Sequence, residues 1–263
     1  MIRASPGSII LVEDANIIIQ KLPSDIGIHR NPRKGTLNAP EKILEDYSFE
    51  EDVLIDEAFP DEFDLEETHS RFRENTEELI KYDTPLISIG GDHSVSFPVI
   101  CALKERFPDL KLVWLDSHLD LKEKVDEHVS HDVVVRELLD HGFSEEEIIF
   151  VGITRVDEDE EEFLENGDLE VYRESGVEEF VREFSSNEQP VYLSVDIDVL
   201  KKELAPGTGY PNGELNLEEV QRIIEEVNPD FADLVEVAPS LDNNNRTISN
   251  GKRILDSLIR NSS

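Results

Sequence analysis

The chain has 263 residues, of which 25 are basic and 61 acidic, and its formal net charge at pH 7 is −36. This balance excludes the usual nucleic-acid binders, because no basic stripe is present that could release the counterions of a phosphate backbone. The single cysteine, Cys101, excludes an internal disulfide framework and says little else about compartment. Acids and a Pro-Gly pair break the N-terminal apolar patch too early for a signal peptide, and no run is long enough to cross a bilayer, so we expect a soluble cytoplasmic protein.

Apolar runs typical of β-strands alternate with helical patterns along the whole chain. In chain order, the apolar runs are 8–14, 16–22, 84–90, 110–116, 147–153, 191–200 and 232–239. The helical patterns fall at 39–47, 64–81, 94–107, 131–141, 158–165, 176–185, 216–227 and 246–260. Continuous apolar strands between helices indicate an α/β fold with a parallel sheet that is covered on both faces. Because no linker or low-complexity segment interrupts this alternation, we expect one domain over residues 1–263.

Acidic residues occur along the whole chain and are not gathered in a tail. An acidic surface could serve cationic partners. The even distribution instead favours a strongly solvated, halophile-like surface adapted to a salt-rich cytoplasm, where ions screen the self-repulsion.

Polar side chains follow three of the apolar runs. These residues are Asp92 and His93 in "GGDHS", Asp116, His118 and Asp120 in "DSHLD", and Asp196 and Asp198 in "SVDIDVL". Each fragment alone is weak evidence, since an Asp-x-Asp pair arises readily by chance in so acidic a chain. Together they are more specific, because the carboxyl ends of parallel strands are where α/β sheets bind their ligands.

The donor chemistry of these fragments predicts a metal site. Asp196 and Asp198 are two residues apart on an apolar run, so they should face one way, and burying two like charges is costly without a cation between them. Six candidate ligands are too many for one metal with an open position: His93, Asp116, His118, Asp120, Asp196 and Asp198. Oxygen and imidazole donors without thiolate disfavour structural zinc and suit Mn²⁺, and shared carboxylates suit two such ions.

These motifs resemble the signatures of the ureohydrolases, the family of arginase, agmatinase, guanidinobutyrase and formimidoylglutamase. The matching segments are "GGDHS" (90–94), "DSHLD" (116–120) and "SVDIDVLKKELAPGTG" (194–209). The resemblance extends to "DLVEVAPSLD" (233–242) and, more faintly, to residues 22–43. It implies a three-layer α/β/α sandwich with a central, mainly parallel sheet.

The resemblance also implies roles for single residues. One manganese ion would be bound by His93, Asp116, Asp120 and Asp196, and the other by Asp116, His118, Asp196 and Asp198. Asp120 would also orient the bridging hydroxide, and Glu236 would pair with the guanidinium of the substrate. A planar cation with several donors is well suited to a carboxylate.

A further histidine of the family serves as proton shuttle to the leaving amine. His131, in "HVSHDVVVREL", best matches that position, and His128 is the competing candidate. The alternative for both is a solvated histidine at a helix start.

Several loops depart from the family pattern. The residue after the shuttle histidine is Asp132 where the family usually has Gly, and Lys201 and Lys202 replace the usual Asp-Pro. Tyr210 stands in place of a small residue, and the loop between Asp120 and His131 is short. These loops shape the substrate pocket, so the departures concern the substrate and not the metal ligands.

The resemblance predicts a hydrolase that releases urea and an amine from a guanidino compound. Agmatine, which would give putrescine, is favoured because Asp126 and Glu127 could hold a terminal ammonium; arginine is second, followed by guanidinobutyrate and formimidoylglutamate. From other classes, a related zinc amide deacetylase and a non-catalytic relative stay open as alternatives. By analogy alone, we expect a homo-oligomer, either a trimer or a hexamer.

Overall fold

The computed structural model describes residues 15–29, 31–125 and 127–262. Its centre is an eight-stranded sheet in the order β2-β1-β3-β8-β7-β4-β5-β6, in which every neighbouring pair is parallel. The strands are β1 (Ile17–Leu22), β2 (Val53–Glu57), β3 (Leu86–Gly90), β4 (Lys111–Leu115), β5 (Ile148–Ile153), β6 (Glu170–Arg173), β7 (Val191–Asp196) and β8 (Phe231–Val235).

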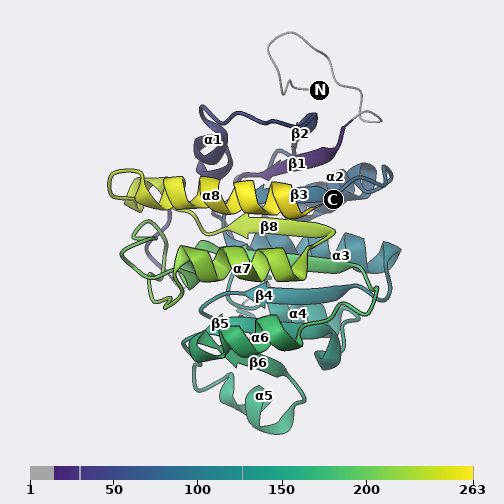
Figure 1. Cartoon of the computed structure of the whole chain (residues 1–263), viewed down its shortest axis with the longest axis vertical. Coiled ribbons are helices and arrows are strands. Elements are labelled where there is room, and N and C mark those ends of the chain that lie inside the picture. The colour runs from purple at the N-terminus through teal and green to yellow at the C-terminus, as the bar shows by residue number, and fades with distance from the viewer. Residues whose placement is uncertain (1–14, 30, 126, 263) are drawn as a thin grey trace.

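Helices cover both faces of this sheet, which gives three layers (Figure 1). The helices are α1 (Ala39–Leu44), α2 (Leu65–Leu79), α3 (Ser96–Arg106), α4 (Val134–Asp140), α5 (Glu161–Asn166), α6 (Val177–Glu183), α7 (Leu217–Val227) and α8 (Arg246–Asn261). One apolar core joins the sheet to α1, α6, α7 and α8, and a second joins the opposite face to α2, α3, α4 and α5. The expected α/β/α sandwich with a parallel sheet is confirmed.

The central strands form where the chain is apolar on both sides. Every residue of β3, β5, β7 and β8 is buried, as expected for strands that lie between two helical layers. Helix α7, which covers one face of the sheet, is amphipathic and has a reciprocal cap at its start. For α7, the Asn216 side chain accepts from the Glu219 backbone N–H (3.0 Å) while the Glu219 carboxylate accepts from the Asn216 N–H (2.7 Å). This reciprocal cap satisfies two donors that a helix start would otherwise leave unpaired.

All eight predicted helices are present, and six of the seven predicted strand runs contain a strand. The remaining run, 8–14, lies outside the described residues. The two edge strands, β2 and β6, match none of the predicted strand runs. β6 has only four residues and none of them is buried, while β2 is buried only in its first two positions, so neither carries the continuous apolar signal of a central strand.

The strand order places four strands with site motifs side by side. β3 and β4 follow each other among the described strands, yet β8 and β7 lie between them in the sheet. The connection from β3 to β4 passes over two strand positions, and the connection from β6 to β7 returns to them. In open α/β sheets, ligands bind where the strand order reverses in this way, beyond the carboxyl ends of the strands. The motifs that follow β3, β8, β7 and β4 therefore lie together at the carboxyl edge of the sheet.

Among the residues that the structure describes, no helix is both long and apolar enough to span a bilayer.

We expect the melting midpoint to rise by roughly 5–10 °C between dilute buffer and molar KCl, equivalent to about 2–4 kcal/mol for a chain of this size. At a net charge of −36, exposed carboxylates repel each other over the long Debye length of dilute buffer, and added salt screens this repulsion. Thermal unfolding monitored by circular dichroism over a KCl series tests the expectation. A midpoint that does not change with salt would contradict the halophile-like interpretation.

Candidate metal and active site

Burial of acidic side chains is concentrated at one edge of the sheet. Ten acidic residues of the described chain are buried: Asp92, Asp116, Asp120, Asp132, Glu137, Glu160, Asp196, Asp198, Asp233 and Glu236. Two of the ten lie away from this edge: Glu137 forms an ion pair with Lys124 at 2.9 Å, and Asp233, in the middle of β8, accepts hydrogen bonds from Ser194 and Tyr192. A buried carboxylate is costly without a compensating cation or hydrogen bonds, so this concentration marks the carboxyl edge of the sheet as the functional site.

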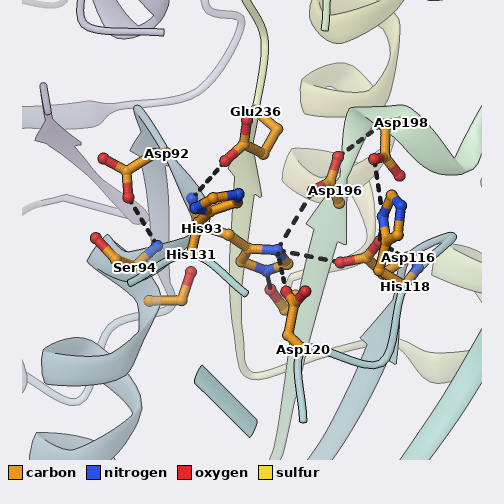
Figure 2. A network of polar contacts seen from close by, with 12 residues as sticks. Asp92, His93, Ser94, Asp116, His118, Asp120, His131, Asp196, Asp198 and Glu236 are labelled. Carbon is orange, nitrogen blue, oxygen red and sulfur yellow. Dashed lines mark hydrogen bonds and ion pairs between the residues drawn. The ribbon is translucent and has the colours of Figure 1, made fainter. Parts of the chain in front are cut away.

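Three strands, β3, β7 and β4, deliver the predicted ligands to this edge, and β8, which lies between β3 and β7, ends just before Glu236 (Figure 2). His93 opens the 3₁₀ turn η2 (His93–Val95) that follows β3, and the segment 116–120 directly follows β4. Asp196 is the last residue of β7, whereas Asp198 lies in the next 3₁₀ turn, η5 (Ile197–Val199). The expectation that both aspartates stand on a strand is therefore wrong in detail, but both still line the same pocket.

The His93 ring is held from two sides. It stacks on the Trp114 ring with centroids 4.0 Å apart and an interplanar angle of 4°. The Ser194 hydroxyl donates to Asp233 Oδ1 (2.8 Å), so the Ser194 oxygen accepts a hydrogen bond from His93 Nε2–H (2.8 Å). In the neutral ring this arrangement leaves Nδ1 without a proton and directs it at the carboxylates, which is the form in which a histidine binds a metal.

Two groups of potential ligand atoms meet at Asp116. The first comprises His93, Asp116 and Asp120, and the second comprises Asp116, His118 and Asp198, with the ligand atoms of each group within 4.8 Å of one another. Asp196 joins the first group, because its Oδ2 lies 3.3 Å from His93 Nδ1. All six predicted ligands are thus brought together, and Asp116 lies between the two groups as a bridging carboxylate would.

The local backbone holds these carboxylates in place. Asp116 Oδ1 accepts from the His118 backbone N–H (2.8 Å), and Asp196 Oδ1 accepts from the Asp198 backbone N–H (2.7 Å). Asp198 Oδ1 accepts from the Ser117 hydroxyl (2.7 Å). In each of the three aspartates, one carboxylate oxygen accepts a hydrogen bond from the neighbouring chain, and the other oxygen lies near a histidine of the cluster.

Charge and unsatisfied atoms at this centre fit metal ions. Burial and then the neighbouring charges of Asp198 and Asp116 raise the pKa of Asp196 well above its usual range. His93 Nδ1 and Asp116 Oδ2 are fully buried and make no hydrogen bond within the described chain, although they lie 3.1 Å apart. A cation between them would satisfy both atoms and offset the repulsion among the carboxylates, so the residues present fit a pair of divalent ions.

Two site residues have a backbone that non-glycine residues rarely adopt. The φ angles of Asp120 and Glu236 are 52° and 62°, in the left-handed region. The Glu236 backbone N–H donates to the Gly91 carbonyl (2.8 Å), and one carboxylate oxygen of Glu236 accepts from the His93 backbone N–H (2.9 Å). Such conformations cost of order 1–3 kcal/mol each and are typical of functional sites, where the surrounding contacts maintain them.

Glu236 lines the pocket beside the ligands and is buried. Burial and then the charge of Asp92 raise the pKa of Glu236 well above its usual range. A cationic substrate group in the pocket would favour the ionised form of this carboxylate.

The structure distinguishes the two candidate histidines by position. His131 is buried and lines the pocket, and its Nδ1–H donates to the Gly27 carbonyl (3.1 Å), which leaves Nε2 available to the pocket. His128 does not line the pocket and packs edge-on against His29, with ring centroids 5.6 Å apart. Only His131 is therefore placed to move a proton within the pocket.

The pocket contains residues that the sequence analysis did not identify as site residues. Besides Asp132 and Tyr210, noted there as departures, these are Lys122, Arg155, Asp157 and Glu160. Tyr210 packs edge-on against the His118 ring, with centroids 5.5 Å apart. Of the two acids proposed to hold an ammonium, Glu127 is exposed and does not line the pocket, and Asp126 lies outside the described residues.

Comparison with known proteins agrees with this geometry. Residues 15–260 match the profile of the Arginase family. The chain is 28% identical to the agmatinase of Bacillus anthracis over 257 residues, which cover 89% of this chain and 88% of that protein. Its fold superposes on proclavaminate amidino hydrolase from Streptomyces clavuligerus (TM-score 0.84, 23% identity, 94% and 92% coverage of the two chains) and on arginase from Bacillus subtilis (TM-score 0.81, 21% identity, 93% and 98% coverage). The chain therefore belongs to the Arginase family, the ureohydrolases, and is a hydrolase that acts on guanidino compounds.

Proposed function

We propose that this protein is a binuclear manganese amidinohydrolase, contained in one domain, that cleaves a guanidino compound into urea and an amine. The observation that carries the proposal is the sharing of Asp116 by two ligand groups whose central atoms, His93 Nδ1 and Asp116 Oδ2, are buried and unsatisfied within the described chain. Oxygen and imidazole donors without thiolate suit Mn²⁺. The proposed ligands are His93, Asp116, His118, Asp120, Asp196 and Asp198.

Two such ions would activate a water molecule at neutral pH and stabilise the negative charge that develops in the transition state. The remaining steps fall to side chains of the pocket. The Glu236 carboxylate holds the guanidinium by a charge-assisted contact, and Asp120 accepts a hydrogen bond from the attacking water. His131, fixed through Nδ1 by the Gly27 carbonyl, delivers a proton from Nε2 to the leaving amine.

Agmatine is the substrate that we place first. Several relatives that align with most of this chain are agmatinases, for example those of Bacillus anthracis and Bacillus subtilis, at 28% and 27% identity. Arginine comes second, and guanidinobutyrate and formimidoylglutamate follow. Identity at this level supports the reaction type more strongly than the substrate, because the pocket loops depart from the family pattern at Asp132 and Tyr210.

A urea-release assay with Mn²⁺ tests this function. We expect agmatine to give the highest kcat/KM among agmatine, arginine, guanidinobutyrate and formimidoylglutamate, each measured at low and at molar KCl; for formimidoylglutamate the product measured is formamide, because this substrate contains no guanidino group. The control is the same protein after chelation, which should release no urea. Absence of urea from agmatine, arginine and guanidinobutyrate at both salt concentrations, with two ions bound, would overturn the proposed reaction. Urea from arginine alone would instead correct only the substrate.

A further inference from the structure

One end of the pocket already contains an ammonium group of the chain itself. Lys122 lines the pocket that holds the proposed metal ligands, and its Nζ lies 2.6 Å from Asp157 Oδ2. The second oxygen of this carboxylate, Asp157 Oδ1, lies 2.8 Å from Arg155 Nε. Both oxygens of Asp157 are therefore engaged by cations, and the Lys122 and Asp157 side chains are each 25% exposed.

Two buried carboxylates line the same end of the pocket. Glu160 accepts hydrogen bonds from the backbone N–H groups of Leu121 (3.1 Å) and Asp157 (3.0 Å), so its carboxylate ties together the segments that carry Lys122 and Arg155. Asp132 accepts from the Ser130 hydroxyl (2.7 Å), and its backbone carbonyl accepts from the Lys122 backbone N–H (3.2 Å). Asp132, Asp157 and Glu160 thus form a carboxylate-lined end, in which the Lys122 ammonium lies.

We infer that Lys122 is a specificity-determining residue, because its ammonium competes with the distal amine of a diamine-type guanidino substrate for the carboxylate-lined end of the pocket and so lowers the preference of that end for an amine. This inference rests on the proposed function, since it concerns the end of the substrate that is remote from the guanidinium. It adds to that function a residue that changes the relative kcat/KM of substrates with different distal charges.

The physical basis is competition for the same carboxylates. A substrate ammonium that approaches Asp157 meets the like charge of Lys122 and must displace it, which disfavours the amine. An uncharged alkyl end does not compete with Lys122 for Asp157. Lys122 and Arg155 attract a carboxylate end, but three carboxylates, Asp132, Asp157 and Glu160, outnumber these two cations, so the wild type still favours an amine, by a smaller margin.

Removal of the Lys122 charge should therefore widen the preference of the pocket for a distal amine over a distal carboxylate. In Lys122→Met, which keeps the aliphatic chain, we expect kcat/KM for agmatine to rise about tenfold relative to pentylguanidine, as removal of one competing charge contact of about 1.4 kcal/mol allows. The effect should lie in KM, because the contact of the distal group is the same in the ground state and in the transition state. For 4-guanidinobutyrate the ratio to pentylguanidine should fall by a similar factor. Lys122→Arg, which keeps the charge, should retain the wild-type ratios.

A binding measurement keeps the inference testable without turnover. Putrescine, titrated by calorimetry into the manganese-loaded protein, should bind Lys122→Met about tenfold more tightly than wild type, for the same reason. Lys42→Met removes the same charge at an exposed pair with Glu45 and should leave every ratio unchanged. Substrate ratios and putrescine affinity within twofold of wild type, in a Lys122→Met protein with normal thermal unfolding, would overturn the inference. Failure of wild type to release urea would overturn the proposed function instead, because the putrescine titration does not depend on it.

Discussion

Asp196→Asn is expected to abolish urea release and to lower the metal content of the protein. The wild type, incubated with Mn²⁺ and desalted, should retain close to two ions per chain, whereas the variant should retain one or none. Asp196 Oδ2 lies 3.3 Å from His93 Nδ1, at the centre of the ligand cluster, and an amide in its place supplies no negative charge to share between two ions. Because bound metal contributes several kcal/mol to the transition state, kcat/KM should fall on the order of 10³-fold or more.

The stability of the same variant separates loss of metal from loss of fold. In the presence of a chelator, Asp196→Asn should melt at or above the wild-type temperature. Burial and the neighbouring charges of Asp198 and Asp116, which raise the pKa of Asp196, make a carboxylate at this position unfavourable without metal. With Mn²⁺ the order should reverse, since metal binding stabilises the wild type. Elemental analysis and thermal unfolding check both statements.

Asp230→Asn is the matched control for this variant. Asp230 accepts from the Val191 backbone N–H (2.9 Å) at the opposite end of β7, so the same substitution there should leave metal content and urea release unchanged. One tightly held zinc and no manganese in the wild type, or full metal content in Asp196→Asn, would show that the binuclear manganese assignment is wrong.

The ligand cluster could be predicted from sequence because each of its residues follows a strong apolar run. The runs before His93, Asp116 and Asp196 are buried on both faces, so their ends are recognisable from composition alone. The sequence does not state that β8 and β7 lie between β3 and β4. The rule that parallel strands end at one edge was sufficient, since it does not depend on strand order.

The far end of the pocket could not be predicted in the same way. Asp157 and Glu160 belong to the acidic stretch "VDEDEEEFLE", in which no local pattern separates a pocket residue from a solvated one. Their partner Lys122 comes from the loop after β4, 35 positions before Asp157, and the contact exists only because β5 pairs with β4. The expectation that Asp126 and Glu127 hold the ammonium of the substrate rests on their charge. In a chain with 61 acidic residues, charge alone does not locate a site.

Glu236→Gln is expected to lower kcat/KM by about thirty- to a thousandfold, or about 2–4 kcal/mol, without loss of metal. Glutamine keeps the size of the side chain, and its amide oxygen can still accept from the His93 backbone N–H, so the ligand His93 should stay in place. What is lost is the negative charge that pairs with the guanidinium of the substrate. Urea-release kinetics together with elemental analysis measure the two effects separately.

The pKa of Glu236 gives this experiment a second readout. Because burial and the charge of Asp92 disfavour ionisation of Glu236, its carboxylate depends on a cation to become charged, and a bound guanidinium is such a cation. Substrate binding to the metal-free wild type should therefore release a proton at pH values below the raised pKa of Glu236, and binding to metal-free Glu236→Gln should release correspondingly less. Calorimetry in buffers of different ionisation enthalpy measures that difference. If Glu236 instead only supports the turn that carries His93, Glu236→Gln should release urea at a near-normal rate and show the wild-type proton release, and the assignment to the guanidinium fails. Loss of metal in Glu236→Gln would contradict it equally, because it would place the residue among the ligands.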